Sequence, residues 1–537
     1  MRHHDSTSDT SAESPAPEQH SHPQEASSGR AVPAWLLSGV VHGVALALMA
    51  LIVQASHPII DEPAITVSPQ PITPLPQQPT TIDPPTATSP TMEVPEEAPE
   101  YSPPSELTAI DETTDRESEL TSSEDGSEGE PTAVADSALA TDGFAMAIGS
   151  GANAAGLYSA RRGPGKQTSR RKWDGPNGPH GRDNTIDAAL RWFKKHQSPN
   201  GQWDVDGYQA NCQDAGAKCE PGTAHTGADG DLACTAYAVL CYLGAGHDHR
   251  TPGKYRKTVQ AALDYLVAAQ KADGLWGTRN YEHAIVAMAL AEAYGMSTDS
   301  RLREPAQKGI AIILARQAKD GAYGLGWDYG AANPARNDAS VSGWNIMALK
   351  SAKASGLDVG TGLEGSATYL DRAWKAANPG LDAAKLDPYK ATSVFPYVWN
   401  SQDGSVQVEP GAKQHDLSCV GALCAVFLGH QADDPVLNSL ANHIDKTQYP
   451  TAYPTNTYYL YYNSMVMFQL GAARFTKWNL PVVELLTKAQ RTDGCHQGSW
   501  DYTGTVFHGH ETGRLLSTAY SCLTLEVIYR NTQVLAN

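Results

Sequence analysis

The first 160 residues contain almost no basic side chains and no cysteine. They hold three Lys+Arg (Arg2, Arg30 and Arg116) against 24 Asp+Glu, whereas the rest of the chain holds 37 against 35. The first 104 positions also carry 18 of the 35 prolines. A chain divided in this way is not one globule, and its acidic part excludes nucleic-acid binding driven by bulk charge. The balanced remainder is long enough to bury one large core.

Charge is also missing from one long apolar run, Ala34 to Val53. A helix of this length spans a hydrocarbon core of roughly 30 Å. The run is longer than the apolar part of a cleaved signal peptide, and it follows 33 polar residues rather than a short basic segment. We therefore predict a single-pass membrane anchor. Arg30 precedes it and no basic residue follows before Arg116, so we expect the N-terminus in the cytoplasm and the rest in the periplasm or outside the cell.

Two polar side chains, Ser38 and His42, share one face of this predicted span. A histidine in lipid is costly and often functional. With the proline-rich stretch that follows, the pattern resembles the transmembrane helix of TonB-type energy transducers. That resemblance implies an inner-membrane partner driven by protons. A polar patch near the membrane interface, or in a homodimer seam, is the alternative interpretation.

The composition predicts four regions along the chain. Residues 1–33 form a disordered cytoplasmic tail and residues 34–53 the membrane helix. Residues 54–180 form a disordered linker that is first proline-rich, then acidic, then glycine-rich and basic, because such segments lack apolar surface to bury. Residues 181–537 form the globular domain.

A repeat punctuates this domain. Four segments read Gln-x3-Gly-x-[aromatic or His], each after a helical pattern: Gln197–Trp203, Gln270–Trp276, Gln317–Tyr323 and Gln490–His496. Glycine after a helix supplies the left-handed cap. Amphipathic helices are expected at 183–197, 252–270, 302–317, 361–377, 434–445 and 480–490, and each precedes a more apolar one. Six outer and six inner helices predict an all-α (α/α)6 toroid.

These units resemble the QW repeats of the prenyltransferase/squalene oxidase group, which includes terpenoid cyclases. The resemblance covers about residues 183–537 and is closest to uncharacterised, membrane-anchored members of planctomycete type. It implies a site in the mouth or cavity lined by inner helices, and an isoprenoid or peptide ligand.

The chemistry of that group is incomplete in this chain. The Asp-x-Asp-Asp acid of the cyclases is absent, and Asp204-Val-Asp206 is the nearest string. Acid–base or metal chemistry would fall to side chains near the starts of inner helices, where helix capping is the competing interpretation. Those candidates are Asp231, His283, Asp338 and Asp416. No cofactor is predicted, and zinc is left open.

Two further groups are singled out. Trp344, Tyr458, Tyr459, Tyr461 and Tyr462 are candidates to line a cavity, with core packing as the alternative. All eight cysteines follow position 211, and in an exported domain Cys212 and Cys219 are predicted to form a disulfide. The remaining cysteines are expected as buried thiols.

Three functions fit these observations, and whether the chain is an enzyme stays undecided. The preferred one is a membrane-anchored toroid that binds a ligand or partner without catalysis. The second is a cyclase-like or prenyltransferase-like enzyme acting on an isoprenoid or another envelope substrate. The third is a TonB-like transmitter of force.

Overall fold

The computed structural model describes residues 158–174, 181–212, 216, 218–223, 227–410, 415–502 and 509–530. All of them belong to one compact unit that spans residues 108–537. The predicted tail, the span at 34–53 with Ser38 and His42, and most of the linker lie outside the described residues. Among the helices in the described ranges, none is both long enough and apolar enough to cross a membrane.

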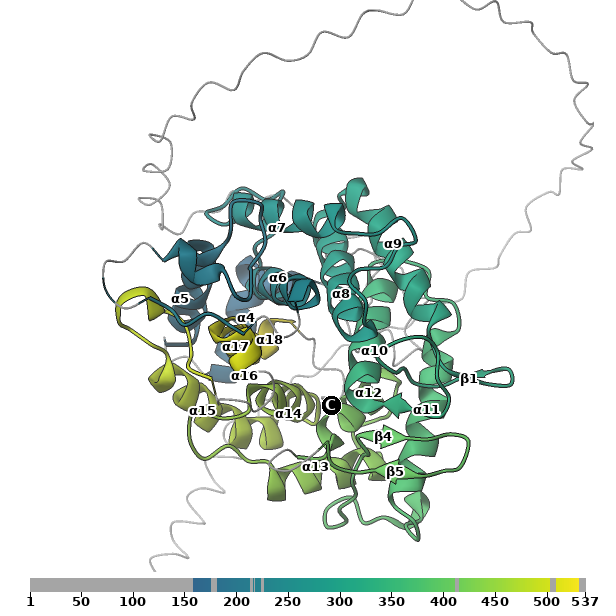
Figure 1. Cartoon of the computed structure of the whole chain (residues 1–537). Helices are drawn as coiled ribbons and strands as arrows, with labels where there is room; N and C mark the ends of the chain where they lie inside the picture. Colours follow the sequence, from purple (N-terminus) through teal and green to yellow (C-terminus); the bar gives the residue numbers. More distant parts are fainter. Residues whose placement is uncertain are drawn as a thin grey trace, which may run out of the picture. The chain divides into compact units, whose positions relative to one another are not determined.

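Twelve helices of the described ranges form two concentric rings (Figure 1). The outer helices are α5 (Gly181–His196), α7 (Arg256–Ala268), α9 (Ser300–Ala315), α11 (Gly362–Ala377), α13 (Pro435–Thr447) and α15 (Ala472–Ala489). The inner helices are α6 (Gly227–Gly244), α8 (Asn280–Ser297), α10 (Ala339–Ala354), α12 (Ser418–Phe427), α14 (Thr457–Gln469) and α17 (Arg514–Leu525). Each inner helix packs against the next, and α17 packs against α6. The ring is closed, which confirms the predicted (α/α)6 toroid.

The burial of the helices follows their sequence patterns. The inner helix α8 is apolar around its whole circumference and nearly all of its side chains are buried. The outer helix α7 buries a single stripe that includes Val259, Leu263 and Leu266. An all-round apolar helix has to lie inside and a one-stripe helix has to cover it.

The glutamine of each repeat ties two outer helices together. Gln197 Nε2 donates to the carbonyls of Gly201, in its own loop, and of Thr258, on α7, at 2.9 and 3.0 Å. The other three glutamines do the same toward the next outer helix. The last of them, Gln490, donates to Thr185 on α5 and so closes the outer ring.

The tryptophans define the repeat register, and they correct two of the four predicted copies. The indole N–H groups of Trp203, Trp276, Trp327 and Trp500 each donate to a carbonyl of the preceding outer helix, at 2.6–2.9 Å. Tyr323, predicted as the third aromatic, is instead exposed in a small hairpin of β1 (Lys319–Asp320) and β2 (Tyr323–Gly324). Four extra residues in the third and fourth loops displaced the true tryptophan beyond the expected position.

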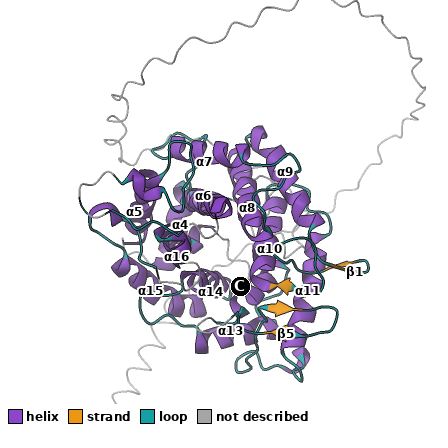
Figure 2. Ribbon diagram, viewed as in Figure 1, coloured by secondary structure: helices purple, strands orange, loops and turns teal. Residues whose placement is uncertain are grey.

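Short elements connect the helices (Figure 2). A three-stranded antiparallel sheet consists of β3 (Asn337–Asp338), β4 (Val398–Trp399) and β5 (Val406–Gln407). The remaining pieces are η3 (Tyr208–Asn211), η4 (Ala383–Lys385), η5 (Gly494–His496), α16 (Gly509–Thr512) and α18 (Val527–Arg530).

One segment of the predicted linker belongs to the folded domain. η2 (Ser159–Arg161) and α4 (Gly163–Asp174) pack on α18. Trp173 sits edge-on to Phe468 and Phe475, with ring centroids 5.3 and 5.0 Å away. Trp173 and Arg161 are buried in the core, so the packed part of the chain that the structure describes extends from residue 181 back to Tyr158.

Candidate functional site

A pocket opens where the inner helices begin. Its empty volume is ≈ 660 Å³, which includes the space on its solvent-open side. The lining comes from the first three turns of α6, the first turns of α8, α10 and α17, the loops before α8 and α10, and the end of α16. The lining residues are Gly230, Ala233, Cys234, Tyr237, Arg279, Tyr281, Glu282, Tyr329, Ser340, Thr512 and Leu516. We call this the mouth pocket.

Aromatic rings form much of the mouth pocket. The rings of Tyr281 and Tyr329 are nearly parallel, with centroids 6.4 Å apart. Tyr237 is buried below them, and its hydroxyl lies 2.7 Å from that of Tyr520. The Tyr281 hydroxyl accepts a hydrogen bond from the Trp344 indole at 3.0 Å. These contacts hold the rings in place, so the pocket offers fixed apolar faces with hydroxyl groups at their edges.

Glu282 is the carboxyl group among the lining residues. Burial raises the pKa of Glu282 above its ordinary value, and the partly exposed guanidinium of Arg279 only partly offsets that effect. The Arg279 Nε atom lies 3.0 Å from Oε2 of Glu282. The negative charge of Asp229 adds to the rise. A carboxyl whose pKa is raised in this way keeps its proton longer than a surface glutamate and is suited to donate it.

Asp229 stands behind this pair. Its carboxylate accepts hydrogen bonds from the backbone N–H of Thr278 at 3.1 and 3.2 Å and from the Thr278 hydroxyl. A Cβ atom on Gly277 would lie 2.3 Å from Asp229 Oδ1, and this glycine has φ +62°. The loop therefore needs glycine here in order to wrap the carboxylate and to present Arg279.

The four predicted acid–base residues lie apart from one another and have separate partners. His283 accepts from the Trp276 N–H at 3.1 Å and faces the Gly309 carbonyl at 2.9 Å, while burial lowers its pKa to about 4. Asp338 caps α10 by accepting from the N–H groups of Ser340 and Val341. Among the described residues, no hydrogen bond or ion pair joins any two of the four. Asp338 and Asp416 accept from N–H groups at the starts of α10 and α12, as in the capping interpretation. Asp231 instead accepts from the Val205 N–H, and His283 contacts backbone atoms outside α8.

The other two, Asp231 and Asp416, also have pKa values shifted by local packing. Burial raises the pKa of Asp231 to about 6, with a further rise from Asp204 and Asp206. Burial alone would raise the pKa of Asp416, but the hydrogen bonds from His443 and Ser418 outweigh burial and hold the pKa below its usual value. Neither residue lines the mouth pocket.

The five predicted cavity aromatics mostly form core. Trp344, Tyr458, Tyr459, Tyr461 and Tyr462 are all at most 4% exposed and pack edge-on or tilted against one another and Tyr520. They fill the interior of the inner ring between its two ends. Tyr461 also lines a second pocket at the opposite end.

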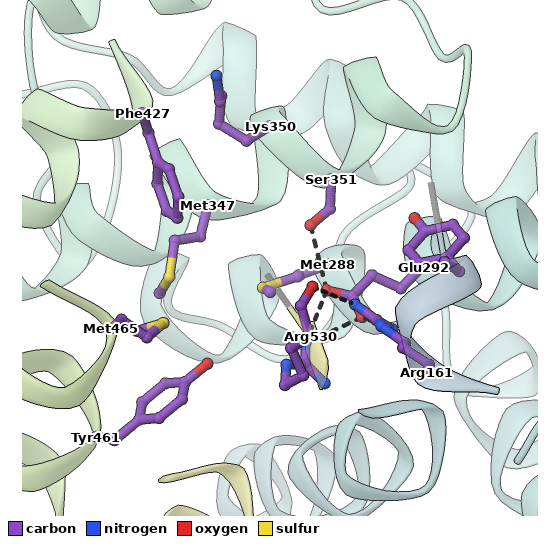
Figure 3. A pocket seen from close by; sticks show the side chains of 11 residues that line it. Arg161, Met288, Glu292, Met347, Lys350, Ser351, Phe427, Tyr461, Met465 and Arg530 are labelled. Carbon is purple, nitrogen blue, oxygen red and sulfur yellow. Dashed lines mark hydrogen bonds and ion pairs between the residues drawn. The ribbon is translucent and has the colours of Figure 1, made fainter. Parts of the chain in front are cut away.

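That second pocket lies where inner helices end, under η2 (Figure 3). Its empty space is ≈ 440 Å³. At its centre Glu292 accepts from Arg161 at 2.8 Å and from Arg530 at 2.8 and 3.0 Å. Burial alone would raise the pKa of Glu292, but the two guanidinium groups outweigh it and hold the pKa below the usual range. We call this the closed end, since Tyr158 and Arg161 of the N-terminal segment form part of its wall.

The disulfide pairing differs from the prediction. Cys212 is joined to Cys495, with Cα atoms 5.9 Å apart, rather than to Cys219. Cys219 is a buried free thiol beside them, and His196 lies against all three sulfur atoms. This is the group of His, Cys, Asp and Glu side chains in the described ranges that has the geometry to hold a metal ion.

No protein-family model matches the sequence, and no curated protein matches it. The solved structures that resemble the chain are α/α enzymes acting on sugars. One is an inactive variant of an α-1,6-mannanase of Salegentibacter sp. in complex with α-1,6-mannotriose, at 11% identity and TM-score 0.44 over 65% of this chain and 99% of that one. Others are an α-amylase from Clostridium perfringens (10%, TM-score 0.42, 65% and 98%) and a family 76 mannosidase from Bacteroides thetaiotaomicron (9%, TM-score 0.42, 65% and 98%).

These comparisons correct the family expectation. The three structures named above are a mannanase, an α-amylase and a mannosidase, and none of them is a terpenoid cyclase or a prenyltransferase. The QW-repeat resemblance is therefore wrong as a family assignment, although its glutamines and tryptophans build the ring. The functions expected with it are withdrawn: the non-enzymatic cyclase-like binder, the isoprenoid enzyme and the TonB-like transmitter.

Sequence reasoning missed the mouth pocket residues. None of Arg279, Glu282 and Tyr329 was singled out from the sequence. One signal was available, since Arg279, Tyr281 and Glu282 cluster at the start of an inner helix. Nothing in the sequence places Tyr329 beside them.

Proposed function

We propose that this chain is a glycan-processing enzyme whose active site is the mouth pocket, with Glu282 as the proton donor. The observation that carries the proposal is a buried carboxyl of raised pKa set among fixed tyrosine rings. A fold likeness at the level of the known structures says nothing of substrate, so the support comes from the pocket itself.

The lining matches the surface of a sugar ring. The C–H faces of a pyranose pack on aromatic rings such as Tyr281 and Tyr329, while its hydroxyls need donors and acceptors at the edge. Arg279, Ser340 and Thr512 supply those polar groups. A pocket lined by aromatic rings with a few convergent polar groups is the usual form of a small-molecule site.

The chemistry would be protonation of a glycosidic oxygen. Cleavage of a glycosidic bond needs a carboxylic acid that is still protonated near neutral pH, normally with a second carboxylate nearby. Burial raises the pKa of Glu282 above its ordinary value, which favours the protonated form that the first role needs. Asp229 is the nearby carboxylate whose charge acts on Glu282, and Thr278 holds it in place.

The test compares full-length wild type with Glu282→Gln on α-1,6-mannotriose, the corresponding mannan, and gluco- and galacto-oligosaccharides. We expect cleavage by the wild type, and a loss of about 10²–10⁴ in kcat with little change in KM for Glu282→Gln, because the amide keeps the shape and lacks the acidic proton. Glu364→Gln, on the exposed side of α11, is the matched control and should retain full activity. Failure of the wild type to bind or cleave any of these sugars would contradict the proposal.

A further inference from the structure

A cluster of soft ligands lies on the seam of the ring, away from both pockets. His196 ends the first outer helix, Cys212 follows η3, Cys219 lies in the loop that follows, and Cys495 is in η5 after the last outer helix. The first and last outer helices, α5 and α15, meet at this seam. The cluster thus gathers ligands from both ends of the domain.

The four ligand atoms lie as close together as the ligands of one small metal ion, with two of the sulfur atoms joined in the disulfide. His196 Nε2 lies 3.1 Å from Cys212 Sγ, 3.2 Å from Cys495 Sγ and 3.5 Å from Cys219 Sγ. The four ligand atoms all lie within 4.8 Å of one another. Four ligands on a tetrahedral zinc, at about 2.3 Å for sulfur and about 2.0–2.1 Å for nitrogen, are about 3.5–3.8 Å apart.

The histidine is oriented for such a role. His196 Nδ1 lies 2.7 Å from the Trp192 carbonyl, which can only accept, so Nδ1 carries the proton. Nε2 then points its lone pair at the three sulfur atoms. A metal-bound histidine almost always donates its other N–H to a carbonyl or carboxylate in this way. The Trp192 ring also lies 4.3 Å from the imidazole, centroid to centroid, and fixes its plane.

The cluster is closed to water. The four residues are at most 6% exposed. A site with four protein ligands and no route to solvent has no position for a substrate, which is the arrangement of structural rather than catalytic zinc.

We propose that His196, Cys212, Cys219 and Cys495, in the thiol form, bind one Zn²⁺ as a Cys3His structural site that fastens the ring. The three thiols give up their protons to become thiolates, the imidazole stays neutral, and no electron is transferred in this step. The Cys212–Cys495 disulfide excludes the metal, so a thiol reductant must first return both sulfurs to thiols with two electrons. The ion would link positions separated by 283 residues, and this binding energy would add to folding.

Cys219 distinguishes a zinc site from a disulfide with an unused histidine and thiol beside it. In a disulfide form, Cys219 is an unused thiol and Cys219→Ala changes no metal content. With zinc bound, Cys219 is a ligand, and its loss should lower zinc affinity by at least about 10–100-fold. Cys424→Ala, at another buried free thiol that lies on α12, is the matched control.

The experiment purifies the full-length protein in the presence of a thiol reductant and measures zinc by elemental mass spectrometry. We expect about one zinc per chain in wild type and Cys424→Ala, and much less in Cys219→Ala. A wild type without zinc that also fails to take up added Zn²⁺ would overturn the proposal. Equal zinc in all three proteins would overturn it too.

A second measurement needs no variant and covers the case that Cys219→Ala does not fold. X-ray absorption at the zinc edge should show three sulfur neighbours and one nitrogen neighbour at the distances given above. A zinc shell of oxygen and nitrogen would place the metal elsewhere and refute the site. Neither readout depends on sugar cleavage, so the outcome is independent of the proposed activity.

Discussion

One helix, α8, carries two buried glutamates whose pKa values shift in opposite directions. Glu282, in its first turn at the mouth, has a raised pKa because burial outweighs the half-exposed Arg279. Glu292, near its other end, has a lowered pKa because Arg161 and Arg530 outweigh burial. The same residue type on the same helix is therefore poised to give up a proton at one end of the ring and fixed as an anion at the other.

The opposite pKa shifts distinguish a candidate active site at the mouth from a structural ion-pair cluster at the closed end. At the closed end the Glu292 carboxylate is paired with two guanidinium groups, those of Arg161 and Arg530. Two cations beside one buried carboxylate hold it in its ionised form, so it is not available as a proton donor. At the mouth, the carboxyl is only partly compensated and the pocket is open, which is the environment in which catalytic acids are found.

The largest effect should come from breaking the closed end with Glu292→Gln. The change leaves Arg161 and Arg530 buried without a counter-charge, which typically costs 3–5 kcal/mol, so about that loss is expected here. The measurement is the urea midpoint of unfolding. Glu304→Gln, in an exposed pair with Lys308, serves as the control and should leave the midpoint unchanged. A loss for Glu292→Gln as small as that of the control would show that the two arginines need no anion.

A second change tests the carboxyl at the closed end that lacks such partners. Glu526 is fully buried, and burial raises its pKa to about 8 although Arg530 opposes the rise. Its Oε2 atom has no hydrogen-bond partner. The folded state therefore keeps a proton that the unfolded state loses near pH 4.5, and the free energy of unfolding falls as pH rises from 4.5 to about 8.

Glutamine at this position cannot ionise, so Glu526→Gln should remove that fall. We expect little difference from wild type at pH 4 and a gain of a few kcal/mol at pH 9. The upper bound is about 5 kcal/mol, since the pKa shift from 4.5 to about 8 is worth about 1.4 kcal/mol per unit. Denaturant unfolding across this pH range is the measurement. Glu484→Gln, on the exposed face of α15, should keep the wild-type slope. Parallel curves for wild type and Glu526→Gln would show that Glu526 is already ionised when folded.

The ring itself could be predicted from the sequence because its signals are local. The stripe of Val259, Leu263 and Leu266 and the all-round apolar run of α8 are helix-period patterns, and the Gln/Gly loops mark helix ends. The register of the third and fourth loops was missed because four inserted residues moved Trp327 and Trp500 away from the gapless spacing. The packed 158–174 segment was missed because its polar sequence, similar to that of a linker, hides one buried arginine and one tryptophan.

The sites could not be predicted because their residues meet only in the folded ring. Asp231 and Asp338 were candidates for acid–base chemistry because of their positions near helix starts. An acidic residue at a helix start most often caps the helix, and Asp338 does so. The pKa of Glu282 is raised by burial, and Tyr329, which lines the same pocket, lies on a different loop. The sulfur cluster joins His196 to Cys495 across the whole domain, and no spacing of two cysteines reveals that.

The smallest effect in stability, and the sharpest test of the mouth, is Arg279→Gln. The Arg279 guanidinium lowers the pKa of Glu282, so its removal should raise that pKa further. A general acid works while protonated, so the alkaline limb of the pH–activity profile should move to higher pH. Because Arg279 is 37% exposed in this ion pair, the free energy of unfolding should change by less than about 1 kcal/mol. Arg372→Gln, which breaks a surface pair with Asp320, is the control for charge loss and should leave the profile in place.

A carbon-13 titration of the Glu282 carboxyl, assigned through Glu282→Gln, reads the same shift without substrate. An unmoved titration would mean that the charge of Arg279 is screened at the mouth, and the contrast with Glu292 would then come from burial alone.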